Sequence, residues 1–339
     1  MNRLGCQISI VLTVHKNRRN YIDRAINSVL SCNVENIQFE IIVASDYEDE
    51  YLKSIDQRPD VRIILCQDQL GVKIISGIEK ANYDIIVFLE DDDIFLLEKL
   101  ERVCYIFKEV SDVGYYHNKS MPSVSNFEEL KINARNLNDS VVFSSSQFKR
   151  LARGNSDYNM SSIAISKTFG NSILEKVTNR ADLLSISPDT FIFLCAVSEG
   201  VKVAIDNIAL TRVEHQDSLS YVSPNRSFED YVSLSVANLY KFKNEYTKFL
   251  DFFPPGIANK LIHFKLLKTE ITLSILEGKK KRVKFSDLMR YLLYNAVFFP
   301  YGDSIKHIIY LTFLSVLPLS ISNLIYRKRY FNYMKSRFL

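Results

Sequence analysis

Four acidic residues stand in a row: Glu90, Asp91, Asp92 and Asp93. They directly follow the apolar run of residues 85–89, and carboxylates this close repel one another unless a cation neutralises them. Oxygen ligands suit hard cations such as Mg²⁺ and Mn²⁺. A divalent ion held in this way can bridge a diphosphate and stabilise the charge that develops as it leaves. The simpler interpretation is a solvated turn whose acids favour the start of a helix at Leu96.

The residues around this acidic cluster (Glu90–Asp93) predict the elements that must position it. Short apolar runs, separated by segments with helical spacing, occupy residues 8–14, 39–44, 61–65 and 85–89. Continuous apolar strands that alternate with helices are typical of a parallel sheet covered on both faces. Ligands of such sheets bind beyond the carboxyl ends of the strands, which is where the acidic cluster stands. The first half of the chain is therefore expected to be α/β.

The remainder of the chain divides into three kinds of segment. Residues 96–110 and 190–197 read as helices and residues 162–166 and 201–205 as strands, whereas residues 114–153 read as a polar excursion. Long helical patterns then cover residues 228–253, 257–276 and 285–299. We expect a catalytic or binding α/β domain over residues 1–224 and a helical region over residues 225–339.

Composition and motif searches exclude several classes of protein. Of the 339 residues, 47% are hydrophobic and 24% charged, which excludes a disordered or fibrous chain. The five cysteines form no CxxC or Cys/His cluster, which argues against a disulfide framework or a structural zinc site. Three of them lie in or beside apolar runs, which favours buried thiols in a reducing compartment. No signal-peptide pattern occurs at the N-terminus, so we expect a cytoplasmic protein. Walker, GxGxxG, GxSxG and HExxH motifs are absent from the sequence.

The C-terminal residues 279–339 form a basic tail. They carry 12 Lys and Arg but 2 Asp and Glu, whereas the rest of the chain is net acidic. The apolar residues 308–326 and the basic residues after them fit an interfacial segment on an anionic membrane surface. A packed helical subdomain, an oligomer interface and a true membrane span are the alternatives. No recognised nucleic-acid-binding module accompanies the basic residues, so nucleic acid is not an expected partner.

Four stretches occur in a fixed order: SIVLTVHKNRRNYIDRAINSVL, FEIIVASD, GVKIISGIEKANYDIIVFLEDDDIF and SPDTFIFLCAVSEGVKVAIDNIALTRVEHQDSLS. Their order and spacing resemble family 2 glycosyltransferases of the GT-A fold over roughly residues 8–220. The acidic cluster matches the DxD-type motif of that family. The chain departs from the family where Val14 replaces a usual Pro and where Pro188, in place of a common Glu, precedes Asp189. The resemblance implies a mostly parallel GT-A sheet flanked by helices.

The same resemblance implies which residues bind the donor. The polar loop after the first strand, with Thr13 and His15, would lie near the nucleotide. Asp46 would accept a hydrogen bond from the imide or amide edge of the base, although an Asp that ends a strand is also a common turn residue. Lys73 is the basic residue nearest to the middle motif and would also bind the nucleotide.

The resemblance further implies the roles at the reacting centre. Asp92 would bind the metal, Mn²⁺ or Mg²⁺, and Asp91 or Glu90 would face the ribose or nearby waters. Asp189 would be the general base that takes the proton from the acceptor hydroxyl, since a carboxylate is ionised at neutral pH. His215 would touch the metal or a phosphate oxygen. The alternatives are an ordinary acid at a helix start for Asp189 and a hydrogen-bonded loop residue for His215.

The sequence therefore predicts an inverting, metal-dependent glycosyltransferase that moves a hexosyl or related sugar from a nucleotide-diphosphate sugar to an acceptor hydroxyl. The basic tail and the resemblance imply an acceptor on a glycan or lipid carrier, as in polysaccharide biosynthesis, and a protein peripheral at the cytoplasmic face of the membrane. One alternative is a nucleotidyltransferase on a related sheet, with Lys16, Arg18 and Arg19 as its basic loop. The other is a catalytically inactive GT-A-like scaffold.

Overall fold

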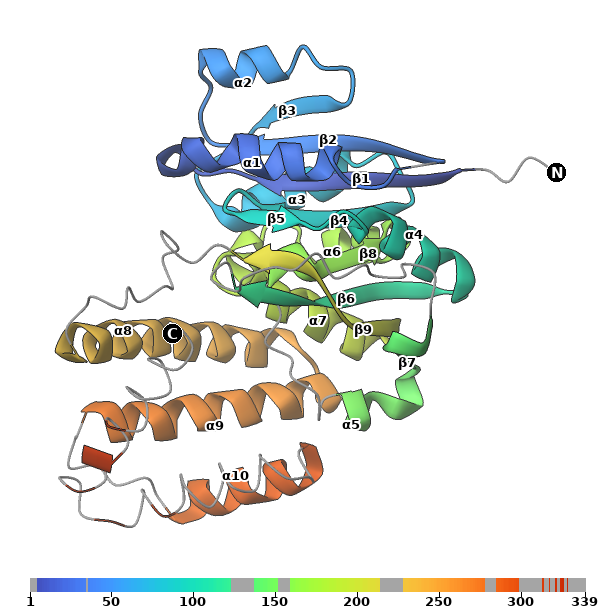
Figure 1. The fold of residues 1–339 in the computed structure, drawn as a ribbon. Coiled ribbons are helices and arrows are strands. Elements are labelled where there is room, and N and C mark those ends of the chain that lie inside the picture. Colours follow the sequence, from blue (N-terminus) through green and yellow to red (C-terminus); the bar gives the residue numbers. More distant parts are fainter. Residues whose placement is uncertain are drawn as a thin grey trace. The chain divides into compact units, whose positions relative to one another are not determined.

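The structure, a computed structural model, describes residues 5–34, 36–122, 137–151, 159–213, 228–277 and 285–298, and positions 313, 317, 321, 324, 325 and 328. The chain divides into two compact units (Figure 1). Unit 1 comprises Met1–Ser146 and Ser156–Ser218, and unit 2 comprises Gln147–Asn155 and Leu219–Leu339. The domain boundary predicted after residue 224 lies outside the described residues and stays a prediction.

Unit 1 is built on one mixed sheet. Its strands are β1 (Cys6–Thr13), β2 (Ile37–Ser45), β3 (Val61–Leu65), β4 (Ile85–Glu90), β5 (Asp93–Phe95), β6 (Val113–Pro122), β7 (Ser140–Phe143), β8 (Ile163–Ser166) and β9 (Lys202–Val213). They follow the order β3-β2-β1-β4-β8-β6-β9-β5, and β7 also pairs with β9. The strands β1 to β4 are mutually parallel, as their apolar runs predict, and β8 joins β4 in the antiparallel direction.

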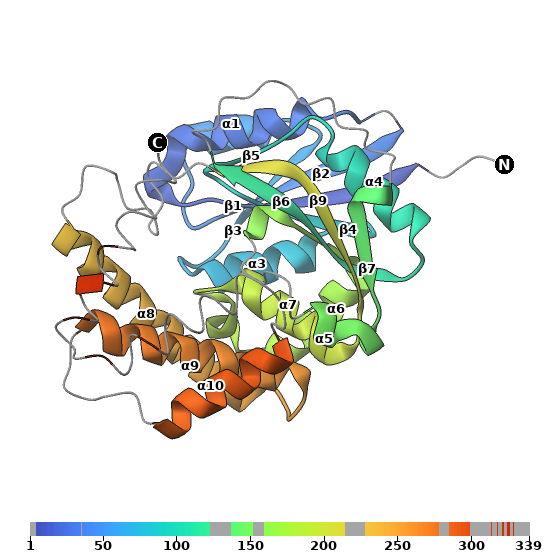
Figure 2. The same cartoon turned by 60° about the horizontal axis from the view of Figure 1, so that its bottom comes forward.

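Helices cover both faces of this sheet. They are α1 (Arg19–Leu30), α2 (Glu50–Ile55), α3 (Leu70–Lys80), α4 (Lys99–Glu109), α6 (Lys167–Val177) and α7 (Pro188–Glu199). Figure 2 shows α1 and α4 on one face and α3, α6 and α7 on the other. The alternation of side chains along β1 explains the arrangement, since Ile10 belongs to the core with α1 and α4, whereas Val11 meets Gly77 of α3.

Two segments of unit 1 correct the sequence-based expectations. The predicted polar excursion over residues 114–153 begins with most of strand β6, in which Tyr115 and Tyr116 are fully buried between β8 and β9. The strand was missed because polar residues follow the two tyrosines, which hides the apolar pattern. The acidic cluster also contains an unexpected strand, because Asp93 begins the three-residue β5.

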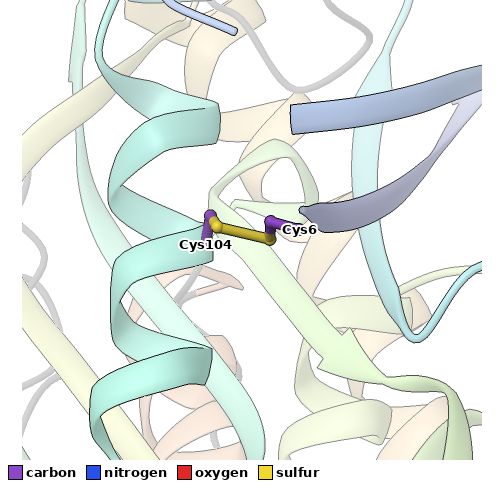
Figure 3. The surroundings of a disulfide bond; sticks show 2 residues. All are labelled: Cys6 and Cys104. Carbon is purple, nitrogen blue, oxygen red and sulfur yellow. A yellow bond between two sulfur atoms is a disulfide. The ribbon is translucent and has the colours of Figure 1, made fainter. Parts of the chain in front are cut away.

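A disulfide links the start of β1 to α4. Cys6 and Cys104 pair across a sequence separation of 98 residues, with Cα atoms 6.0 Å apart (Figure 3). The cysteine spacing argued against disulfides, and this pair corrects that expectation: packing of α4 beside β1 brings together two cysteines that look unrelated in sequence. Cys32 and Cys195 are buried and free, as expected.

Unit 2 consists of helices. Its main ones are α8 (Phe228–Phe252), α9 (Ile257–Glu277) and α10 (Phe285–Phe298), which confirm the predicted helical patterns, and a short α5 (Phe148–Leu151) also belongs to it. Aromatic packing joins them, since Phe264 of α9 stacks on the buried Tyr291 of α10. Within the described part of the chain, no helix has the length and apolarity that a membrane span requires. Most of the apolar segment 308–326 lies outside the described residues.

Replacement of Gly71 by Ala is expected to destabilise unit 1. A Cβ atom at position 71 would overlap the carbonyl oxygen of Ala181, which belongs to backbone and cannot swing away. We expect Gly71→Ala to lower the free energy of unfolding by about 1–3 kcal/mol in chemical denaturation. Gly170→Ala is the matched control in the same unit, because its Cβ would meet side-chain methyl groups, the nearest 3.1 Å away. Equal stability of the two variants would contradict this packing.

Candidate active site

The carboxyl ends of three parallel strands meet at one edge of the sheet. Thr13 at the end of β1 lies opposite Ala44 of β2 and opposite Glu90 of β4. The segments that follow, His15 after β1 and Asp46 after β2, therefore leave the sheet beside the acidic cluster. This edge is where ligands of open α/β sheets bind. The structure thus brings together Thr13, His15, Asp46 and the acidic cluster, as expected.

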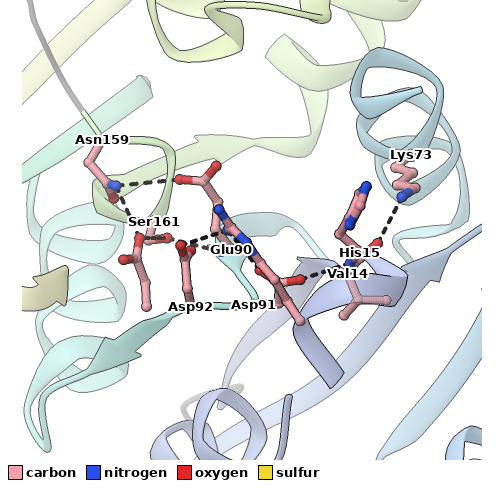
Figure 4. A network of polar contacts seen from close by, with 10 residues as sticks. Val14, His15, Lys73, Glu90, Asp91, Asp92, Asn159 and Ser161 are labelled. Carbon is pink, nitrogen blue, oxygen red and sulfur yellow. Dashed lines mark hydrogen bonds and ion pairs between the residues drawn. The ribbon is translucent and has the colours of Figure 1, made fainter. Parts of the chain in front are cut away.

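The acidic cluster is tied to the segment after β1. Asp91 is buried, and its Oδ2 accepts a hydrogen bond of 2.8 Å from the backbone N–H of His15 (Figure 4). Arg18, in the 3-10 turn Lys16–Arg18, places Nη1 3.2 Å from Asp91 Oδ1 and 2.6 Å from Asp92 Oδ2. Burial lowers the pKa of Arg18, but the charges of Asp92 and Asp91 outweigh this effect and leave that pKa raised. The bonds from His15 and Arg18 show that the cluster is not simply a solvated turn.

The other side of the cluster rests on a short turn before β8. Ser161 Oγ donates to Asp93 Oδ2 at 2.6 Å and accepts from the backbone N–H of Glu90 at 2.9 Å. Asn159 Nδ2 donates to Asp93 Oδ2 at 3.0 Å. Figure 4 shows Asn159 and Ser161 on one side of the cluster, with His15 and Lys73 on the other. Sequence analysis missed Asn159 and Ser161, because they lie in a polar stretch without a recognisable pattern.

Negative charge accumulates around Glu90. Its pKa is raised well above the usual value, first by burial and then by the charges of Asp93, Asp92, Asp189 and Asp91. Burial likewise raises the pKa of Asp91 to about 6, although the His15 N–H acts in the opposite direction. The site therefore has more carboxylates than its own cations balance, which favours the binding of a further cation.

Asp189 lies near this cluster although 96 residues separate it from Asp93. It occupies the first turn of α7, behind Pro188 at the helix start, and it is half-buried. Its charge contributes to the raised pKa of Glu90, so the two carboxyl groups are close enough to interact. The turn before α7 is held by a 2.9 Å hydrogen bond from Gln69 Nε2 to Ser185 Oγ. Asp189 is therefore near enough to the acidic cluster for its charge to act on Glu90.

Lys73 connects the ends of β1 and β2. Its side chain is buried, and Nζ donates to the carbonyl oxygen of Val14 at 2.8 Å and to Asp46 Oδ1. Burial would raise the pKa of Asp46, but the hydrogen bond and charge of Lys73 outweigh it and lower that pKa. Lys73 therefore keeps Asp46 ionised and fixes the first loop. The predicted contact of Lys73 with a nucleotide stays a prediction.

The described residues of the site would hold a metal ion together with other ligands. In the ranges that the structure describes, no group of three or more His, Cys, Asp and Glu residues could hold a metal. Mg²⁺ commonly takes one or two protein carboxylates and completes its shell with water and substrate phosphates. A half-buried Asp92 beside Asp91 fits that kind of coordination. The other predicted ligand, His215, lies outside the described residues.

Behind the Ser161 turn lies a buried lysine that sequence analysis also missed. Lys99 is fully buried, and its Nζ donates to Asn118 Oδ1 and, at 3.4 Å, to the carbonyl oxygen of Ser161. Burial lowers the pKa of Lys99 to about 7, and the charge of Asp206 offsets this only in part. Because Ser161 also donates to Asp93, the hydrogen bond from Lys99 helps to position Ser161 against the acidic cluster.

Comparison with known proteins shows similarity to glycosyltransferases. Residues 9–158 match the family model described as glycosyl transferase family 2. An uncharacterized glycosyltransferase of Nostoc sp. (strain PCC 7120) is 29% identical over 119 residues, which cover 33% of this chain. That match spans 36% of the length of the Nostoc protein.

Solved structures show the same fold. The crystal structure of S. aureus TarS 1-349 superposes with a TM-score of 0.53 at 13% identity, covering 97% of this chain and 92% of that one. The same TarS fragment in complex with UDP-GlcNAc gives a TM-score of 0.52 at 14% identity, with the same two coverages. The resemblance to family 2 glycosyltransferases and the GT-A fold are thereby confirmed.

Lys99 makes the stability of the protein depend on pH above neutrality. Its pKa is about 7 when folded and about 10.4 in an unfolded chain, so between these values the unfolded state binds more protons and stability rises with pH. Lys99→Met should remove this contribution, which is at most about 1.4 kcal/mol per pH unit for one proton. Chemical denaturation at several values between about pH 7.5 and about pH 9.5, which lie inside this window, measures the slope of stability against pH.

The control for this prediction is Lys108→Met, a change at an exposed lysine of the same helix. We expect the slope of stability against pH to be lower in Lys99→Met than in the wild type, and unchanged in Lys108→Met. Parallel slopes for all three proteins would contradict a buried, proton-releasing Lys99.

Proposed function

We propose that the protein transfers a sugar from a nucleotide-diphosphate sugar to an acceptor hydroxyl, with inversion at the anomeric carbon. The match of residues 9–158 to the family model described as glycosyl transferase family 2 supports this proposal. The observation that supports the proposal is the proximity of Asp189 to the acidic cluster, since its charge contributes to the raised pKa of Glu90. The acidic cluster suits the binding of a diphosphate through a cation, and Asp189 suits the removal of a proton from the acceptor. Transfer by single displacement would use both functions at the same edge of the sheet.

The nucleotide base would bind at Asp46. An ionised carboxylate accepts hydrogen bonds and cannot donate them, and the lowered pKa keeps Asp46 ionised. It would therefore favour a base that offers an N–H at its edge, as the imide of uracil and the amide of guanine do. UDP-GlcNAc, which S. aureus TarS binds, makes a uridine diphosphate sugar the first donor to test. Thr13 and His15 would line the nucleotide beside Asp46.

The diphosphate would bind at the acidic cluster through a divalent cation. Asp92 and His215 would hold Mn²⁺ or Mg²⁺, and Asp91 would face the ribose or waters around the ion. When bound, the ion would stabilise the negative charge on the departing diphosphate. The raised pKa of Glu90, caused by burial and by neighbouring acids, supports a site short of positive charge.

Asp189 would act on the acceptor. Its carboxylate would take the proton from the acceptor hydroxyl as that oxygen forms a bond to the anomeric carbon. The bond between this carbon and the diphosphate oxygen breaks at the same time, and the electron pair leaves with the nucleoside diphosphate. Attack from the face opposite the leaving group inverts the configuration. The half-buried position of Asp189 in the first turn of α7 supports this role.

The acceptor would be a glycan or a lipid-linked glycan, as in polysaccharide biosynthesis. The 12 basic residues among residues 279–339 support a peripheral location at an anionic, cytoplasmic membrane face. A lipid-linked acceptor would be presented at such a surface.

Thermal unfolding with nucleoside diphosphates tests the donor site. A ligand at 100 times its dissociation constant stabilises by about 2.7 kcal/mol. We expect one of UDP, GDP, CDP and dTDP to raise the melting temperature of the wild type in the presence of Mn²⁺, with UDP tested first. Asp92→Asn should lose the metal-dependent part of this shift. Asp84→Asn, an exposed aspartate before β4, is the matched control and should behave as the wild type. No shift with any of these nucleotides would contradict the proposed function.

A further inference from the structure

The guanidinium of Arg18 lies inside the acidic cluster, paired with carboxylates that are distant from it in sequence. A single nitrogen, Nη1, lies 2.6 Å from Asp92 Oδ2 and 3.2 Å from Asp91 Oδ1. The Arg18 side chain is 19% exposed, and those of Asp91 and Asp92 are 4% and 11% exposed. The two ion pairs are therefore shielded from solvent, where charge-assisted hydrogen bonds are stronger than at an open surface.

These ion pairs involve the same carboxylate that a divalent cation would need. An ion bound to Asp92 would take up a lone pair of the carboxylate and would repel a guanidinium a few ångströms away. Coulomb repulsion falls only slowly with distance in a partly buried site. Arg18 in its present position and a divalent ion at Asp92 therefore oppose each other.

We infer that Arg18 is a built-in counter-ion of the acidic cluster, which a divalent cation must displace from Asp92, and which then binds the diphosphate. This inference rests on the proposed function, because it uses the cation and diphosphate assigned there. The planar guanidinium binds phosphate as readily as carboxylate. An incoming diphosphate thus offers Arg18 a new anionic partner as the cation takes Asp92.

The position of Arg18 in the chain allows such a movement. The residue ends the three-residue turn Lys16–Arg18, just before α1 begins at Arg19. Its guanidinium contacts Asp91 and Asp92, which follow β4 in the chain. A change of partner by Arg18 would need rotation of its own side-chain bonds and no shift in the pairing of β1 with β4. The consequence is positive coupling, in which nucleotide and cation each strengthen the binding of the other.

The binding of Mn²⁺ alone to the full chain tests this inference without activity. Electron paramagnetic resonance of free Mn²⁺ gives the dissociation constant for the wild type and Arg18→Gln. We expect Arg18→Gln to bind Mn²⁺ about tenfold more tightly, a factor within the usual range of coupling between sites. Arg62→Gln is the matched control. Arg62 pairs with Glu40 at 3.5 Å, away from the acidic cluster, so this substitution removes the same charge without changing the cluster. It should bind Mn²⁺ as the wild type does.

A second variant keeps the test decisive if Arg18→Gln fails to fold, as judged by circular dichroism. Arg18→Lys keeps the charge but loses the planar fork, so it should bind Mn²⁺ more tightly than the wild type does. Where Arg18→Gln folds, Arg18→Lys should bind Mn²⁺ less tightly than Arg18→Gln. Saturating UDP should tighten Mn²⁺ binding more in the wild type than in either variant. Equal or weaker Mn²⁺ binding by the variants, or no binding by any of the proteins, would overturn the inference.

The two proposals fail in different experiments. The proposed function fails if no nucleoside diphosphate stabilises the wild type. The role of Arg18 fails if metal binding without nucleotide does not rank as stated.

Discussion

Mutual repulsion among the carboxylates at the end of β4 is the constraint on which the arrangement of unit 1 depends. Glu90, Asp91 and Asp93 are packed into the protein, where each charge is costly unless a hydrogen bond or cation meets it. His15 and Arg18 meet the cluster from one side, and Ser161 meets it from the other. The charge that these groups leave unbalanced adds to the effect of burial in raising the pKa of Glu90. A site with this excess of negative charge is suited to bind a cation and, through it, an anionic diphosphate.

The two ends of the site differ in how firmly they are fixed. At the Asp46 end, the buried Lys73 binds both Asp46 and the carbonyl oxygen of Val14, so β1, β2 and α3 hold that carboxylate together. At the Asp92 end, the partner is Arg18 on a short turn, and a bound diphosphate would offer this arginine an alternative partner. A fixed end suits the recognition of one base. An adjustable end suits the entry of a diphosphate together with its cation.

The sequence predicted the parts of the fold that follow from local patterns. Continuous apolar runs identified β1 to β4, and the row of acids after β4 indicated where the site lies. Strand β6 was missed, because its burial comes from β8 and β9 and not from a local apolar pattern. Local patterns also gave no sign that Cys6 meets Cys104. Residues that touch only after folding leave no periodic signal.

The same distinction explains which site residues were found. Asp46, Asp92 and Asp189 were predicted through their resemblance to family motifs, and their roles stay predictions. Ser161 and Lys99 were missed, because they act through residues far away in sequence. Arg18 was noticed only as part of a basic loop, and its pairing with Asp91 and Asp92 became visible in three dimensions.

The central claim is that Asp189 and the acidic cluster form one active site. Its most direct test is the rate at which the Asp189→Asn variant releases nucleoside diphosphate from the preferred nucleotide sugar, with water as the acceptor. Loss of a general base commonly costs about 10²–10⁴-fold in rate. The account predicts a loss of this size while the variant keeps its stabilisation by nucleoside diphosphate and Mn²⁺. Asp182→Asn, at an exposed ion pair shortly before α7, is the matched control and should react as the wild type does. An Asp189→Asn variant that releases nucleoside diphosphate at the wild-type rate would contradict the account.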